Sequence, residues 1–444
     1  MAISAIRNPY RNLPVLKKAI ISLSAVAIFI LLQITFTSRK ELKTTSQIVV
    51  KTIPKTNSAR LEVTPNESPL YFIMHVGPMK TATSTMQCSL MNLESQKLLP
   101  DNIVLAESNY KDCRRMDLNG GKSIVRCIRK WKQRQKKMPK CWKKQVLPYI
   151  KKQQKLNRSI IVSQENLSWL TKMIKNKKNK PTDFLNQLNE SLGERYQIVV
   201  IVTYRTFFDW VYSYFVQHNK VGSQDKRDFD HFPDEGGKKR TEIRPFAERS
   251  IGAHGVRNYF ADKIIEFFSS VDYIDIKVLN LDDGDIMKQF LCDGLPPPLS
   301  HTMCNLKDKI TLDTDMNAAP ENLWANALAI KAHDNKLIQT NITRKSLIYQ
   351  IMDYQKEKGV LSNDFPLKCP DEDFFVLLLQ KTLDLYKNVF KDDTPQERRE
   401  KERLYRENLK KKRDKFCEID TDTMLMQDVW KSFFMRYSSN NAAL

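Results

Sequence analysis

One stretch near the start of the chain constrains the fold more than any other, because it joins a buried strand to the start of a helix. Residues 70–76 (LYFIMHV) are apolar and rich in strand-forming side chains, and residues 77–78 (Gly-Pro) end that run with turn chemistry. Apolar side chains then recur at helical spacing from Met86 to Leu93. The stretch therefore predicts a strand, a tight loop and a helix, the unit from which parallel α/β sheets are built.

The loop between this strand and helix is chemically suited to a phosphate. The first N–H groups of a helix have no partner within the helix, and the helix dipole is positive at that end. A lysine and several hydroxyl groups add charge and donors at the same place: Lys80, Thr81, Thr83, Ser84 and Thr85. A loop for nucleoside triphosphates would read G-x-x-x-x-G-K-S/T, but Met79 stands directly before the lysine, so an ATP site of that kind is disfavoured.

Three further apolar runs predict strands of the same sheet. They are residues 159–163 (SIIVS), 197–204 (QIVVIVTY) and 273–281 (YIDIKVLNL). The second is an almost continuous run of β-branched residues, which is typical of a strand buried on both faces. Because predicted helices separate the strands, we expect a single large α/β domain with a central parallel sheet and flanking helices.

Side chains with useful chemistry follow three of these strands. Lys80 comes after the first strand, Glu165 after the second and Arg205 after the third. Ligands of open parallel sheets bind beyond the carboxyl ends of the strands, so we expect the three side chains to share one site. Ser213 lies about two helical turns beyond Arg205 in the next predicted helix, so both could reach the same phosphate.

These motifs resemble the donor-binding motifs of sulfotransferases. The first resembles their 5′-phosphosulfate loop, roughly P-K-S/T-G-S/T-S/T, except that Met79 is inserted after Pro78 and Ala82 stands where glycine is usual. Arg205 and Ser213 resemble the 3′-phosphate motif, although the acidic residue and the proline that usually follow the arginine are absent. In order and spacing, the chain resembles the membrane-anchored, Golgi-type members of this family over residues 69 to 293.

The resemblance implies a P-loop-like nucleotide-binding fold, the donor 3′-phosphoadenosine 5′-phosphosulfate, and a reaction that needs no metal. It also implies which residues bind the donor: Lys80, Thr81, Ala82, Thr83, Ser84, Thr85, Arg205 and Ser213. Lys80 is in addition expected to act in catalysis, by stabilising the oxygen that leaves the sulfur.

A general base must take the proton of the acceptor, and sulfotransferases of this type use a glutamate or a histidine. We select Glu165, because it follows a strand beside the two phosphate motifs. His75 ranks second, since a histidine inside a strand is more commonly a hydrogen-bonded core residue, and His218 and His254 rank third.

The N-terminal part of the chain predicts a membrane anchor. Residues 19–37 are apolar and uncharged, and they are long enough to cross a thin bilayer such as that of the Golgi. Basic residues flank both sides and weakly favour a cytoplasmic N-terminus; a cleaved signal peptide is the alternative. We therefore expect a cytoplasmic tail (1–18), a type II signal anchor (19–37), a flexible stem (38–68), a lumenal catalytic domain (69–393) and a charged helical extension (394–444) that opens with a capping box.

Cysteines and sequons fit the same compartment. Eight cysteines permit complete pairing in an oxidising space. Cys292 and Cys304 flank a proline-rich loop and are expected to pair, whereas Cys88 lies within the first predicted helix and is a candidate for a free thiol. Four N-x-S/T sequons could carry glycans in the lumen: Asn157, Asn166, Asn189 and Asn341.

The net charge of +22 favours an acidic partner. A lumenal domain does not meet nucleic acid, so we expect an anionic glycan or glycoprotein acceptor, and consider protein tyrosine less favoured. Residues 111–158 are strongly basic. They form a solvated helix face, an inserted loop, or a wall that attracts an acidic substrate, with Trp131 and Trp142 available to stack on sugar rings.

Two other functions are compatible with an anchored lumenal chain. A metal-dependent glycosyltransferase would need an Asp-x-Asp sequence, and three such sequences begin at Asp283, Asp313 and Asp420. A non-catalytic protein that binds anionic glycans through its lysines would not need Lys80 in particular. A chelator that abolishes transfer would favour the glycosyltransferase.

Overall fold

The computed structural model describes residues 69–78, 83–106, 124, 127–128, 130, 138–173, 181–219, 231–232, 241–252, 260–310, 322–338, 342–360 and 364–438. The predicted tail, anchor and stem lie outside these ranges. Among the residues described, no helix is both long and apolar enough to cross a membrane.

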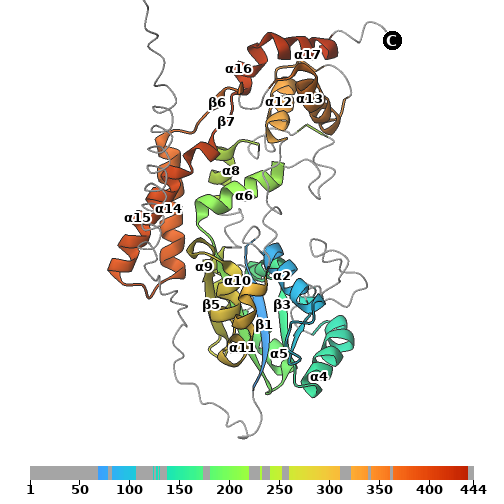
Figure 1. Cartoon of the computed structure of the whole chain (residues 1–444), viewed down its shortest axis with the longest axis vertical. Coiled ribbons are helices and arrows are strands. Elements are labelled where there is room, and N and C mark those ends of the chain that lie inside the picture. The colour runs from blue at the N-terminus through green and yellow to red at the C-terminus, as the bar shows by residue number, and fades with distance from the viewer. Residues whose placement is uncertain are drawn as a thin grey trace, which may run out of the picture. The chain divides into compact units, whose positions relative to one another are not determined.

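A five-stranded parallel sheet forms the centre of the fold, with strand order β2-β3-β1-β4-β5 (Figure 1). The strands are β1 (Leu70–Val76), β2 (Ile103–Leu105), β3 (Ser159–Ser163), β4 (Tyr196–Tyr204) and β5 (Asp275–Asn280). The predicted α/β class, with a central parallel sheet and flanking helices in one domain, is confirmed. Four strands lie where their apolar runs predict them, whereas the three-residue edge strand β2 is not predicted.

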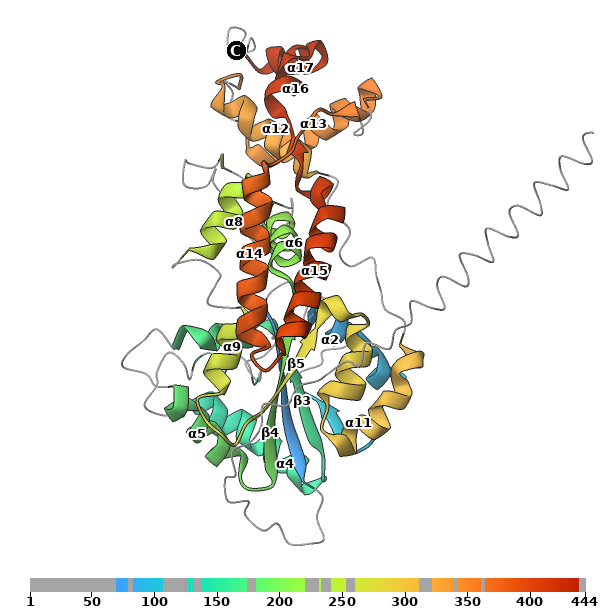
Figure 2. The ribbon, with the colours of Figure 1, turned by 90° about the vertical axis from the view of Figure 1, so that its left-hand side faces the viewer.

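Helices cover both faces of the sheet, because side chains point alternately to either face along each strand. Phe72 and Met74 of β1 belong to one hydrophobic cluster, and Tyr71 and Ile73 belong to the other. Figure 2 shows α5 and α9 on one side of the sheet and α2 and α11 on the other. The helices that contribute to the two clusters are α5 (Pro181–Leu192) and α9 (Ala261–Phe268) for the first, and α2 (Thr83–Ser95), α10 (Ile286–Lys288) and α11 (Pro297–Met303) for the second.

The basic segment before β3 is helical and is anchored in the first cluster. A π-helical turn, Trp142–Val146, leads into α4 (Leu147–Lys155). Val146 and Ile150 lie on the side of this helical segment that is buried in the first cluster. Trp142 is fully buried, with 0% of its surface exposed, so the expectation that it stacks on a sugar ring is wrong. Its lysine neighbours suggest a surface position, but the indole ring packs into the core. Trp131 lies outside the described residues.

A second group of helices continues from the sheet: α6 (Phe207–Asn219), α8 (Ile243–Ile251), α14 (Glu372–Val389) and α15 (Pro395–Lys411). Helix α14 contacts α6, α9 and α15. The capping box at Thr394 is confirmed, since its hydroxyl accepts from the N–H of Glu397 and the glutamate accepts from the N–H of Thr394. Tyr405 and Leu409 of α15 belong to the same cluster as the sheet, so this highly charged helix shares the main core.

A separate cluster, which the sequence analysis does not predict, joins four helices towards the C-terminus. They are α12 (Leu323–Asp334), α13 (Arg344–Lys358), α16 (Thr421–Met426) and α17 (Asp428–Ser438). The short antiparallel strands β6 (Leu367–Lys368) and β7 (Glu418–Ile419) connect this cluster to α14 and α15 along the chain.

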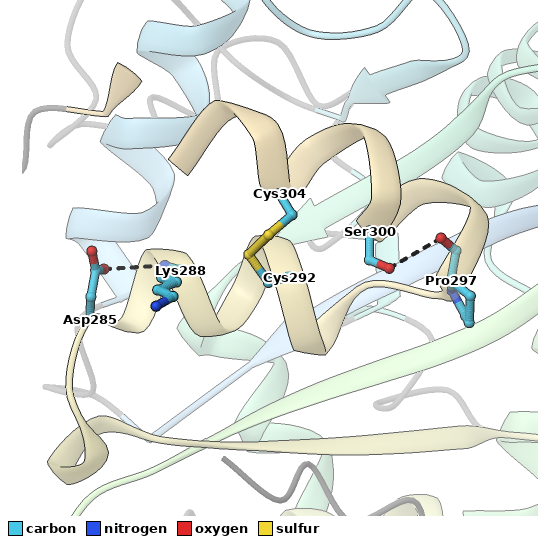
Figure 3. The surroundings of a disulfide bond; sticks show 6 residues. All are labelled: Asp285, Lys288, Cys292, Pro297, Ser300 and Cys304. Carbon is cyan, nitrogen blue, oxygen red and sulfur yellow. Dashed lines mark hydrogen bonds between the residues drawn. A yellow bond between two sulfur atoms is a disulfide. The ribbon is translucent and has the colours of Figure 1, made fainter. Parts of the chain in front are cut away.

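Disulfides stabilise three of these regions. The predicted Cys292–Cys304 bridge is confirmed and joins two neighbouring helical segments (Figure 3). The other two described bridges are Cys127–Cys141 and Cys369–Cys417. Cys88 is also disulfide-bonded, to a partner outside the described residues, so the expectation of a free thiol is wrong. The sequence shows that Cys88 lies in a helix, but it does not show which other cysteine is close to it in the folded chain. Three disulfides fit a lumenal or secreted protein.

Candidate functional site

The carboxyl ends of three neighbouring strands lie at one edge of the sheet. His75 of β1 pairs with Ser163 of β3 and with Ile201 of β4, so the three strands finish nearly level. Glu165 follows β3 and Arg205 follows β4, with the loop after β1 between them. Neighbouring strands are about 4.8 Å apart, which places the backbones that carry Glu165 and Arg205 roughly 10 Å from each other.

Much of the predicted phosphate loop lies outside the described residues. Lys80, Thr81 and Ala82 are not described, and neither are the side chains of Thr83 and Ser84, which begin α2. Thr85 lies in the first turn of α2 and is partly buried. The predicted order of strand, loop and helix is nevertheless confirmed, because β1 ends at Val76 and α2 begins at Thr83.

A small cleft, with a cavity volume of about 10 Å³, connects the end of β1 with the end of β4. Pro78 lines it from the first strand and Arg205 from the other. Aromatic side chains of α6 and of the residue before α9 form much of its wall, and the ring centroids of Trp210 and Phe260 are 4.6 Å apart. The remaining lining residues are Phe207, Ala261 and Leu385. The cleft therefore combines one guanidinium with an aromatic wall.

Arg205 lies beside two carboxylates, Asp209 and Asp282. Burial lowers the pKa of Arg205, and the two carboxylates oppose that shift. Thr206 holds both acids, since its N–H donates to Asp282 Oδ2 (2.9 Å) and its hydroxyl donates to Asp209 Oδ2 (3.1 Å). Lys412, which follows α15, adds a second cation 2.5 Å from Asp209 Oδ2. The guanidinium is thus part of a charge-balanced network rather than an isolated positive group.

Asp282 is the most perturbed acid of this network. Burial raises its pKa to about 6, and the neighbouring carboxylate of Asp209 contributes in the same direction. The N–H of Thr206 and the cations Arg205 and Lys412 oppose the shift. The sequence analysis does not single out this residue, although it lies two residues beyond the end of β5 and the rule that points to Arg205 applies to it equally.

Ser213 does not join Arg205 in the cleft. It lies on α6, six residues beyond Phe207, which corresponds to about 9 Å along the helix axis. Its side chain is partly buried, and it is not among the described residues that line the cleft. The structure places Arg205 and Ser213 on the same strand–helix unit, and their binding of one phosphate stays a prediction.

Hydrogen bonds of the two residues before it fix the place where Glu165 leaves the sheet. It begins a 3₁₀ segment, Glu165–Met173, and is partly exposed. The preceding residue, Gln164, donates its N–H to the carbonyl of His75 (3.1 Å). Gln87 of α2 donates to the carbonyl of Ser163 (2.7 Å). These bonds connect the end of β3 to both β1 and α2, on either side of the predicted phosphate loop.

His75 is a buried, neutral histidine that spans three strands. Its Nδ1 lies 2.7 Å from the hydroxyl of Ser163 on β3, and its Nε2 lies 2.7 Å from the hydroxyl of Thr203 on β4. The side chain is 0% exposed, and burial lowers its pKa to about 3. This is the environment of a hydrogen-bonded core residue, and it aligns the ends of β3, β1 and β4.

The other histidines and acidic pairs lie elsewhere. His218 is exposed near the end of α6 and packs edge-on against Tyr214, whereas His254 lies outside the described residues. Asp283 is 2.5 Å from Lys401, and Asp285 caps α10 through the N–H groups of Met287 and Lys288 (Figure 3).

The remaining Asp-x-Asp sequences are no better placed. Asp420 caps α16 and accepts from Thr423, and the sequence that begins at Asp313 is outside the described residues. Within the residues described, no three His, Cys, Asp or Glu side chains are grouped so as to hold a metal ion.

No family model matches the sequence, and no curated protein matches it significantly.

Proposed function

We propose that this chain is a sulfotransferase that moves a sulfuryl group from 3′-phosphoadenosine 5′-phosphosulfate to a hydroxyl or amine of an anionic glycan or glycoprotein. One observation carries the proposal: the neighbouring strands β3, β1 and β4 end at one edge, and each is followed by a group that this reaction needs. Glu165 offers a carboxylate, the loop with Lys80 offers a cation and hydroxyls, and Arg205 offers a guanidinium.

The small cleft beside Arg205 has the chemistry that one end of such a donor would need. Its wall of Phe207, Trp210 and Phe260 is apolar and buried, so a purine would contact it only after the cleft opened, and the guanidinium carries hydrogen-bond donors for a phosphate. Its cavity volume of about 10 Å³ is close to the space of one water molecule, so part of the donor would enter only if the surrounding side chains moved apart. A phosphate would share Arg205 with Asp209 and Asp282.

The proposed reaction is an in-line displacement at sulfur. A bond forms between the acceptor oxygen or nitrogen and the sulfur, while the bond from sulfur to the bridging phosphate oxygen breaks. Negative charge develops on that oxygen, and Lys80 with the N–H groups at the start of α2 would stabilise it. Glu165 would accept the proton of the acceptor, and the products are the sulfated acceptor and adenosine 3′,5′-bisphosphate.

The compartment is consistent with this activity. Three described disulfides fit a lumenal or secreted domain, and the sequence predicts a type II anchor in the Golgi membrane. Glycan chains are modified in this compartment while they are attached to proteins, so the acceptor that we propose would be present there.

The test is transfer of label from sulfur-labelled donor by the full chain to a panel of acceptors. The panel contains uronate-bearing chains, sulfated chains, neutral oligosaccharides and a tyrosine peptide. Lys80→Ala should lower kcat by about 10²–10³-fold, as expected for the loss of one group that stabilises the developing charge. Glu165→Gln should lower kcat by about 10²–10⁴-fold and leave donor binding unchanged.

Arg205 needs a conservative substitution, because its removal would leave Lys412 as the one described cation beside the two carboxylates Asp209 and Asp282, and breaking a buried charge network can cost about 3–5 kcal/mol. Arg205→Lys retains the charge but loses the planar fork of donors, so KM for the donor should rise. Arg195→Lys is the matched control, since Arg195 precedes the same strand at the opposite edge of the sheet. No transfer to any acceptor, or equal effects of the two arginine variants, would contradict the proposal.

A further inference from the structure

The positive charge of this chain is concentrated in one segment. Between Asp117 and Glu165 the sequence contains fifteen Lys and Arg residues and no Asp or Glu, so these 47 residues hold 15 of the 22 net charges. A surface that is basic merely for solubility would intersperse acidic residues, as α15 does with its Glu and Arg pairs. The uneven distribution therefore points to a partner.

The described part of this segment presents six of its seven lysines on one helix. Six of them lie on the turns before α4 and on α4 itself, and all six are exposed: Lys140, Lys143, Lys144, Lys151, Lys152 and Lys155. No described carboxylate forms an ion pair with any of them. We call this set the lysine face.

The lysine face is held rigidly from behind. Trp142, Val146 and Ile150 on the opposite side of the same helix are buried in the first cluster, and the Cys127–Cys141 disulfide fixes the start of the helix. The neighbouring helix α5 carries Asp183 and Glu190, and neither forms a described ion pair with these lysines. A preorganised row of charges binds a polyanion at a smaller entropic cost than mobile lysines do.

The direction of this helix connects the lysine face with the candidate site. Strands β2 and β3 are parallel neighbours, so the helix between them must run back along the sheet, antiparallel to β3. Its last residue, Lys155, is therefore at the amino end of β3, and Lys140 is towards the carboxyl end, where Glu165 follows the strand. The six lysines extend over about 22 Å, which is long enough to contact several units of a linear polymer.

We propose that the lysine face binds a linear, highly anionic glycan of the sulfated or uronate-bearing type. Three disulfides favour a lumenal or extracellular location, which excludes nucleic acid as the usual partner. Anionic lipids are concentrated on the cytoplasmic leaflet, so a membrane surface is the weaker candidate. The inference does not depend on the proposed catalytic activity, because binding is measured without a donor.

The experiment measures binding of a size-defined heparin oligosaccharide to the full chain over a range of salt concentrations. The variant Lys151→Gln/Lys152→Gln/Lys155→Gln removes three charges from the lysine face. The matched control Lys345→Gln/Lys356→Gln/Lys387→Gln removes three exposed charges from α13 and α14, none of which forms an ion pair with a described residue. Thermal melting of each variant verifies that it is folded.

We expect the lysine-face variant to bind about tenfold to a hundredfold more weakly and to show a shallower dependence of log Kd on log salt, because fewer counterions are released. The control should bind like the original protein. Equal weakening in both variants would overturn the proposal, since net charge alone would then explain binding. Absence of heparin binding by the original protein would also overturn it. So would a lysine-face variant that no longer binds phosphatidylserine vesicles but still binds heparin. If heparin binds through these lysines but no acceptor is sulfated, the proposed function fails and this inference stands.

Discussion

Replacement of His75 by glutamine should make the folding of this protein less sensitive to acid. The imidazole is fully buried between the hydroxyls of Ser163 and Thr203, and burial lowers its pKa to about 3. In the unfolded chain the same group titrates near its ordinary pKa of about 6.5. Between these two values the unfolded state binds a proton that the folded state cannot bind, so the free energy of unfolding falls as the pH falls.

The size of this effect follows from the two pKa values. At pH 5 protonation of His75 in the unfolded chain removes about 2 kcal/mol from the free energy of unfolding, and at pH 4 it removes about 3 kcal/mol. Glutamine does not titrate, so the variant should lose that much less stability between pH 7 and these values. The variant also loses part of two hydrogen bonds, which should cost about 1–3 kcal/mol at every pH.

Urea denaturation of both proteins at pH 7, 5 and 4 measures the difference directly. Effects of other titrating groups are common to the two proteins and cancel in the comparison. If the original protein and His75→Gln lost equal stability between pH 7 and pH 5, the buried neutral histidine would be refuted. A catalytic role for His75 would then have to be reconsidered, because an accessible imidazole could act as the general base in place of Glu165.

Two further predictions concern stability. The effect of Asp282 on the pH dependence of stability is opposite to that of His75. Its pKa of about 6 in the folded protein is above the unfolded value, so the folded state binds a proton first. The free energy of unfolding therefore rises as the pH falls from about 7 towards 4. Because the residue is partly exposed, we expect a gain of about 2 kcal/mol or less, visible in the His75→Gln background and abolished by Asp282→Asn in the same urea experiment. Substitution of both Cys292 and Cys304 by serine should lower the free energy of unfolding by about 2–4 kcal/mol, measured by urea denaturation, and an unchanged midpoint would contradict a bridge in the folded protein.

The sheet could be predicted from the sequence because its strands are coded locally. The buried strands β1 and β4 are continuous apolar runs between turn residues, and their bounds agree with the structure within one residue. The edge strand β2 has only three residues and no such run, so nothing in its own sequence identifies it. The cluster of α12, α13, α16 and α17 depends on contacts between segments far apart in the chain, which a local pattern does not contain.

The candidate site could be predicted only where one rule of topology applies. The expectation that groups after β3, β1 and β4 share an edge follows from parallel strands, and the sheet order brings the three strand ends together. The sequence analysis errs where charge is used as a measure of exposure. Trp142 is surrounded by lysines in the sequence, yet the helix turns those lysines outwards and the indole ring inwards.

Helix α15 explains why the surroundings of Arg205 are not visible in the sequence. Its residue Lys401 pairs with Asp283 after β5, and Lys412, just beyond its end, pairs with Asp209 on α6. Tyr405 is buried between these two contacts and packs against Tyr386 of α14. Three carboxylates near the ends of β4 and β5 are thereby balanced by cations that include two from a segment more than a hundred residues away. Because unpaired carboxylates at this edge would repel a phosphate, the anion binding that we propose beside Arg205 would depend on the charged helix.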